Sequence, residues 1–157
     1  MNPLARRTSV AAAIVTLAFA TTTANADPGT QSTLTATTGH GAGLVEVAPT
    51  AHDVVAPDTF NVQGTVNVHE TTPNTAFTVL RRVDLNPDGA CTGTTWLALP
   101  PPNEQTLTTS SGGGGALHFE ISRGAPILDG TRFDVQWRLA GSDGTVLESN
   151  CITVTVK

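Results

Sequence analysis

The stretch Thr131–Leu139, TRFDVQWRL, alternates apolar and polar side chains more clearly than any other part of the chain. Phe133, Val135, Trp137 and Leu139 fall at every second position, and charged or amide residues stand between them. This period of two predicts a β-strand with one face in a core and the other face in water. We therefore expect the fold to be built around this strand.

The same alternation recurs in several other segments, whereas helical periodicity is almost absent after residue 26. The further predicted strands cover residues 60–69, 76–85, 116–122 and 146–156. Gly64 falls in the apolar row of the first of these and predicts a β-bulge. A change of parity between Leu147 and Ile152 predicts a second bulge near Ser149-Asn150.

Turn residues separate these strands. The sequences NPDG at 86–89, SSGGGG at 110–115 and GSDG at 141–144 supply the proline and glycine that tight turns require. We expect three hairpins that pair 76–85 with 92–99, 105–109 with 116–122, and 131–139 with 145–156. The expected fold is all-β, an immunoglobulin-like antiparallel β-sandwich of seven to nine strands with one disulfide.

The first 26 residues have the three parts of a secretory signal peptide. Arg6 and Arg7 precede the apolar run 10–20, and Ala24-Asn25-Ala26 offers small residues for cleavage. The run is too short for a membrane span. We expect cleavage after Ala26, secretion, a flexible N-terminal arm over 27–43 and one β-sandwich domain over 44–157.

Composition narrows the set of partners. The chain has 8 basic and 13 acidic residues, and removal of Arg6 and Arg7 with the signal peptide leaves a net charge of −7. A chain this acidic is repelled by phosphate backbones, so we expect no nucleic acid partner. The expected partner is a protein, a glycan or a small molecule of unknown identity.

The two cysteines, Cys91 and Cys151, are expected to form a disulfide, because the signal peptide directs the chain to an oxidising compartment.

A calcium loop is the alternative interpretation of the segment that begins at Asp84. Asp84, Asn86 and Asp88 stand at alternate positions, and Gly89 follows, as in the first half of an EF-hand. The twelfth position of such a loop needs a bidentate acid, but here it is Thr95. We therefore interpret the segment as a hairpin turn and expect no metal site and no cofactor.

Two residues are candidates for binding. Arg81 stands in the apolar row of its strand, and we interpret it as reaching the rim or pairing with an aspartate, with ligand binding as the alternative. Trp96 is expected to be buried, and it becomes a possible anchor for a partner if it is exposed.

We expect no catalytic residues. A metal site between His69 and His118, and the acid pairs Asp53/Asp58 and Glu120/Asp134, are weaker alternatives than solvated surface groups.

Thr72–Val79, TPNTAFTV, resembles the P-x-T-x-Y-x-V stretch of fibronectin type III domains, with Phe77 in place of the tyrosine. This resemblance implies an immunoglobulin-like sandwich. The acidity, the Ala/Thr/Gly bias and the segment Asp129–Phe133 are similar to the apoproteins of enediyne chromoproteins, which carry an apolar small molecule. More broadly, the chain resembles small secreted bacterial β-sandwich proteins.

From these observations we expect a secreted, non-enzymatic protein that acts by surface recognition or as an envelope-associated structural module. An extracellular small-molecule carrier is the second hypothesis, and an extracellular hydrolase is the third. A cleft lined by apolar side chains would favour the carrier, a flat patch around Trp96 would favour recognition, and carboxylates that converge with a histidine would favour the hydrolase.

Overall fold

The computed structural model describes residues 29–50, 60–104, 106–123, 127–128 and 130–157, so the predicted signal peptide lies outside the described residues. Ten β-strands and no helix occur in these residues. The strands are β1 (Thr30–Thr38), β2 (Ala42–Thr50), β3 (Phe60–His69), β4 (Ala76–Asp84), β5 (Leu97–Ala98), β6 (Thr106–Thr108), β7 (Gly115–Arg123), β8 (Arg132–Gly141), β9 (Val146–Ser149) and β10 (Ile152–Thr155). The expected all-β class is confirmed.

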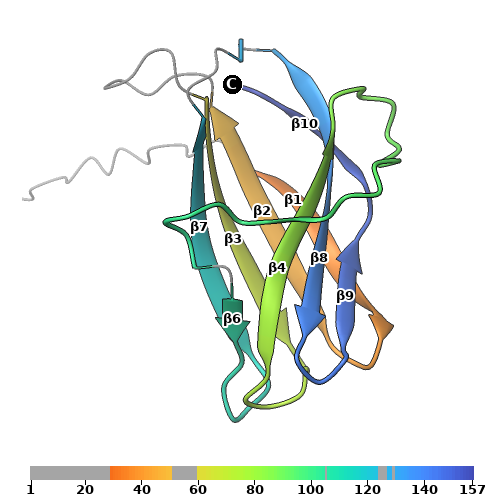
Figure 1. The fold of residues 1–157 in the computed structure, drawn as a ribbon, viewed down its shortest axis with the longest axis vertical. Helices are drawn as coiled ribbons and strands as arrows, with labels where there is room; N and C mark the ends of the chain where they lie inside the picture. The colour runs from red at the N-terminus through yellow and green to blue at the C-terminus, as the bar shows by residue number, and fades with distance from the viewer. Residues whose placement is uncertain (1–28, 51–59, 105, 124–126, 129) are drawn as a thin grey trace, which may run out of the picture.

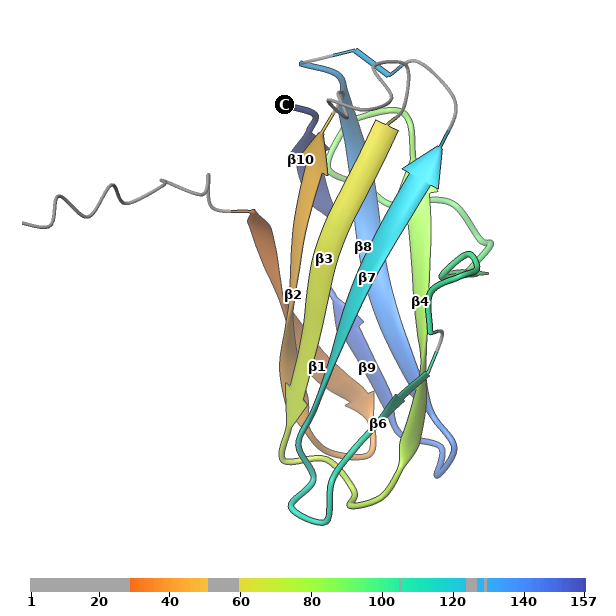
Figure 2. The ribbon, with the colours of Figure 1, turned by 90° about the vertical axis from the view of Figure 1, so that its left-hand side faces the viewer.

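All ten strands belong to one antiparallel sheet. Their order is β5-β4-β8-β9-β1-β2-β3-β7, with β6 also paired to β4 and β10 also paired to β8. Figures 1 and 2 show that this sheet curls over, so that β2, β3 and β7 lie opposite β4 and β8. The sheet ends at β7 on one side and at β4, with the short β5 and β6, on the other.

The core lies inside this curl. In β8 the four apolar residues of the TRFDVQWRL stretch are all buried, as the alternation predicts. Trp137 packs against Phe119 of β7, with ring centroids 5.1 Å apart, and Phe133 meets Phe60 of β3 edge to face at 6.0 Å. These contacts join opposite halves of the curled sheet, and each buried aromatic residue removes a large apolar area from water.

Gly64 does not form a bulge, and the prediction of one is wrong. The register between β3 and β7 runs without a shift, with Gly64 directly opposite Phe119. A Cβ atom at position 64 would lie 2.2 Å from Cζ of Phe119. The glycine is therefore needed because the Phe119 ring lies on its inner side.

The last predicted hairpin is confirmed, including its bulge. β8 pairs with β9 through Arg138–Ala140 and with β10 through Arg132–Val135, and the last strand holds one extra residue between the two ladders. The Oγ atom of Ser149 accepts a hydrogen bond from the Trp137 backbone N–H at 2.9 Å at this break.

The other two predicted hairpins differ from the prediction. β4 pairs with β5 at only two positions, Leu80↔Ala98 and Arg81↔Leu97. The pairing of 105–109 with 116–122 is wrong, because β6 pairs with β4 instead. The chain does turn between β6 and β7, but Thr109 donates its backbone N–H to Thr75 O at 3.0 Å and so continues the ladder with β4.

Most of the predicted N-terminal arm lies in the sheet. β1 pairs with both β2 and β9, and its Leu34 is fully buried. The segment contains few apolar residues, but Ser32 and Leu34 point inward, and the backbone of the strand is bonded on both sides. Residues 30–43 therefore differ from the flexible arm that the composition predicted.

The predicted disulfide is confirmed. Cys91 and Cys151 are bonded, with their Cα atoms 5.5 Å apart and a sequence separation of 60. The bond ties the loop after β4 to the break between β9 and β10. No helix in the described part of the chain is long and apolar enough to cross a membrane.

Candidate functional site

A mainly apolar crevice of about 250 Å³ opens between the two halves of the curled sheet. It lies at the end where β4 and β7 finish and where β3 and β8 begin, which is the upper end in Figure 2. Its lining contains twelve residues other than arginine, namely Val47, Phe60, Val62, Val83, Leu85, Leu97, Ile121, Ile127, Phe133, Val135, Trp137 and Val154. Arg81 and Arg123 complete the lining.

Arg81 points into this crevice because it lies on the inner face of β4, directly opposite Trp137. Only 7% of its surface is exposed. Its Nη1 donates a hydrogen bond to the carbonyl oxygen of Ala98 at 2.9 Å. Desolvation by burial, and then the positive charge of Arg123, lower the pKa of Arg81. The sequence correctly placed one arginine in an apolar row, but the expected aspartate partner is absent among the described residues.

Arg123 continues the inward row of β7 beyond Ile121 and approaches Arg81 from the opposite end of the sheet. Sequence analysis missed this residue, although its parity with Phe119 and Ile121 was a usable signal. The indole N–H of Trp137 is also buried, with no acceptor among the described residues. Every polar side-chain atom on the crevice lining is therefore a hydrogen-bond donor.

The rim of the crevice is apolar and open to solvent. Val83, Leu85 and Leu97 line it and are 41%, 80% and 47% exposed. Large exposed aliphatic side chains grouped around an opening are typical of a binding site rather than of an inert surface.

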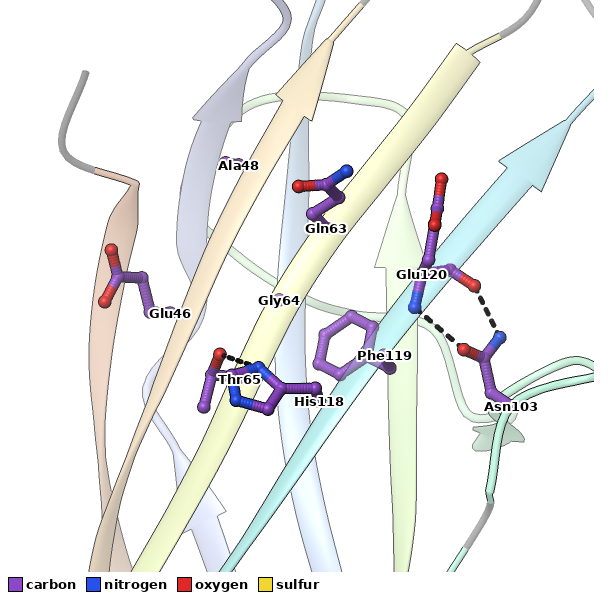
Figure 3. Close-up of a pocket in the computed structure, with 9 residues that line it drawn as sticks. All are labelled: Glu46, Ala48, Gln63, Gly64, Thr65, Asn103, His118, Phe119 and Glu120. Atoms are coloured by element: carbon purple, nitrogen blue, oxygen red, sulfur yellow. Dashed lines mark hydrogen bonds between the residues drawn. The ribbon is translucent and has the colours of Figure 1, made fainter. Parts of the chain in front are cut away.

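A second hollow, the polar groove, lies on the outer face of β2, β3 and β7 and has a volume of about 520 Å³ (Figure 3). Two cross-strand rows form its floor. One row contains Glu46, Thr65 and His118, and the other contains Ala48, Gln63 and Glu120. Asn103 closes one side of the groove from the loop before β6 (Figure 3).

Hydrogen bonds within the groove occupy several of these groups. Thr65 Oγ1 lies 2.8 Å from Nδ1 of His118. The side-chain amide of Asn103 accepts a hydrogen bond from the Glu120 backbone N–H at 2.7 Å and donates to the Glu120 carbonyl oxygen. Asn103 thus occupies the edge of β7 as a neighbouring strand would.

The weaker metal alternative for His69 and His118 has no geometric support. His118 stands opposite Thr65, whereas His69 is the last residue of β3, four positions further along. In the part of the chain that the structure describes, no group of three or more His, Cys, Asp or Glu residues is placed to hold a metal ion.

Trp96 is half-buried, and its ring contacts two guanidinium groups on the outer face of β4 and β8. The Cζ atoms of Arg82 and Arg138 lie 4.9 Å and 4.2 Å from its ring centroid. Arg82 also bonds to Gln136, and Arg138 pairs with Glu148. The ring of Trp96 therefore makes cation–π contacts within the protein.

The residues of the calcium alternative, Asp84, Asn86 and Asp88, are engaged in local turn hydrogen bonds. Asp84 accepts from the Asn86 N–H and from the Thr92 hydroxyl, both at 3.0 Å. The two oxygens of Asp88 accept from the Ala90 N–H and from the Asn86 side chain. These bonds are those of a tight turn, which is the interpretation that the sequence favoured.

Of the two acid pairs considered from sequence, the structure describes only Glu120 and Asp134, and it does not bring them together. Asp53 and Asp58 lie outside the described residues. Glu120 is exposed on β7, whereas Asp134 is fully buried on β8 and therefore is not the solvated charge expected from its outward position. The loop after β4 covers it, and it accepts hydrogen bonds from the Gly89 N–H at 2.6 Å and from the Thr153 hydroxyl at 2.5 Å.

Comparisons of the chain with protein-family models, with curated proteins and with solved structures give no match.

Proposed function

We propose that this protein binds a small, largely apolar molecule in the crevice and acts as a non-enzymatic carrier of it. The observation that supports this proposal is the crevice itself, which combines an apolar wall, an open apolar rim and a buried arginine. Its volume of about 250 Å³ is just below the roughly 300–1,000 Å³ of typical ligand sites. It therefore suits a ligand about the size of a substituted aromatic ring system or a medium-length acyl chain.

Carriage has better support than the surface recognition that the sequence favoured. Trp96, which was an anchor for a partner only if exposed, is half-buried, and its ring already contacts the guanidinium groups of Arg82 and Arg138. The exposed large aliphatic side chains of β4 and β5 gather at the crevice rim instead. Catalysis has less support still, because the described residues that line the crevice include no carboxylate, histidine, serine or cysteine. In the polar groove His118 is bonded to Thr65, and Glu120 stands in a different cross-strand row from Glu46 and His118.

The proposal extends to fold class and location. We assign the curled sheet to the immunoglobulin-like sandwiches, with support from the aromatic contacts between its opposite halves. We also propose that the chain is exported and cleaved after Ala26. The disulfide supports export, because such bonds persist in oxidising compartments.

The test is a titration of the domain with 1-naphthoate and with its neutral isostere 1-naphthamide, followed by two-dimensional NMR. We expect saturable shifts at crevice residues with at least one of the two probes. Leu97→Gln should weaken this binding, because it places a polar group at the rim. The matched control is Leu128→Gln, since Leu128 is also exposed (72%) but does not line the crevice. The carrier proposal fails if neither probe saturates, or if both variants behave alike.

A further inference from the structure

We infer that the crevice selects a ligand with a single acidic group, such as a carboxylate, attached to an apolar body, and that Arg81 and Arg123 bind the acid. This inference rests on the proposed function, because it specifies the ligand class of the same crevice. Three features of the described residues support it: the unused donors of the crevice, its uncompensated charge, and the placement of the two arginines.

The first feature is the excess of hydrogen-bond donors. A guanidinium group has five N–H donors, and among the described residues the side chain of Arg81 donates only to Ala98 O. Arg81 is more than nine-tenths buried, so water has little access to the remaining donors. A ligand that satisfies these groups must bring acceptor atoms, as a carboxylate does.

The second feature is uncompensated positive charge. Neither Arg81 nor Arg123 has a carboxylate partner among the described residues, although the chain as a whole is acidic. A buried cation without a counter-ion is destabilising, and a second positive charge nearby adds repulsion. An anion between the two arginines offsets both penalties. A cationic ligand would increase them.

The third feature is the placement of the two arginines on opposite walls. Arg81 belongs to β4 and Arg123 to β7, the two strands at which the curled sheet ends. A planar acid can therefore receive hydrogen bonds from both sides, since guanidinium groups match carboxylates in a forked geometry. The other twelve lining residues then surround the rest of the ligand with apolar surface.

The experiment compares three probes that share one naphthalene ring at about 0.15 M salt: 1-naphthoate, its isostere 1-naphthamide, and the cation 1-naphthylmethylammonium. Affinities are measured by isothermal titration and by NMR on wild type, Arg81→Met, Arg123→Met and Arg132→Met. Arg132 is the matched control, because it is an exposed arginine at the start of β8 that does not line the crevice. Sodium acetate is a fourth probe, which offers the acid without the apolar body.

We expect naphthoate to bind about tenfold or more tightly than naphthamide, because hydrogen bonds to a charged group exceed those to a neutral one. This preference should be lost in Arg81→Met and in Arg123→Met and kept in Arg132→Met. Acetate should bind far more weakly than naphthoate.

Other outcomes separate the inference from the function on which it rests. Equal binding of naphthoate and naphthamide at the crevice overturns the acid preference but leaves the carrier proposal intact. A preference that survives in both crevice variants also overturns the inference. Loss of all binding in wild type rejects the carrier proposal itself. If Arg81→Met fails to fold, the wild-type comparison and Arg123→Met still decide the question.

Discussion

Asp134 accepts a hydrogen bond from the backbone N–H of Gly89 across a distance of 2.6 Å, and its second oxygen accepts from the Thr153 hydroxyl. One buried carboxylate therefore joins the loop after β4 to β8 and β10.

Replacement of Asp134 by alanine would leave both donors unsatisfied. We expect Asp134→Ala to lower the free energy of unfolding by about 2–4 kcal/mol in urea titration, because hydrogen bonds to charged groups are among the strongest. Glu120→Ala, at an exposed acid, should have little effect, and equal losses in the two variants would contradict this role.

Gly64 leaves room for the ring of Phe119, so any side chain at this position should destabilise the sheet. We expect Gly64→Ala to lower stability by roughly 1–3 kcal/mol, because the added methyl group overlaps the ring. Thermal unfolding measures the effect. Gly93→Ala is the control, since a Cβ atom there has no neighbour within 4 Å. Phe119→Leu should reduce the penalty in a double-mutant cycle, and a purely additive cycle would reject the proposed overlap.

Asn103 protects the edge of β7 by bonding both backbone groups of Glu120. Asn103→Ala should remove these bonds and cost about 1–2 kcal/mol. It should also expose an unpaired strand edge, so we expect more self-association at high concentration. Light scattering and analytical ultracentrifugation measure this change. Gln63→Ala alters an exposed side chain of the same groove without touching the edge, and it should leave the protein monomeric if wild type is monomeric.

Acid should destabilise the protein through Asp84 and Asp143. Hydrogen bonds from Asn86 and Thr92 lower the pKa of Asp84, and those from Thr72 and Thr145 lower the pKa of Asp143. A lowered pKa in the folded state gives stabilisation that is complete above the unfolded value of about 3.9 and is lost as the pH falls through the folded value. We expect the melting temperature to fall more steeply below pH 4 in wild type than in Asp143→Asn. Parallel curves would show that Asp143 makes no contribution.

The disulfide closes a separation of 60 residues, so its removal should be costly. We expect Cys91→Ser/Cys151→Ser to lower the free energy of unfolding by about 2–5 kcal/mol. Reduction of wild type with dithiothreitol should reproduce the loss. An unchanged unfolding midpoint after complete reduction would contradict this expectation.

The sequence predicted what depends on local alternation. The strand of Trp137, the parity change before Ile152 and the inward position of Arg81 all follow from a period of two, which each strand shows by itself. Proximity in sequence did not decide pairing for β6, because its ladder to β4 depends on contacts with a strand 30 residues earlier.

The structural features that the sequence did not predict are those in which one segment of the chain covers another. Asp134 faces outward on its strand, yet it is buried because the loop around Gly89 lies over it. The alternation of apolar and polar residues in 131–139 gives no information about a loop that covers the strand. The crevice could not be predicted from the sequence either. Arg81 and Arg123 are 42 positions apart, and they come near each other only because the sheet curls.

Cys151 and Asn150 are the two residues that separate β9 from β10, at the point where the register with β8 shifts by one residue. A slip of one residue in β10 would turn Val154 and Val156 from the core to solvent. With Cys151 fastened to Cys91, such a slip would need the cross-link to move as well. The disulfide therefore favours one register of β10 against β8. In chains whose cysteines are oxidised before the sheet forms, this constraint on the register is present from the start of folding.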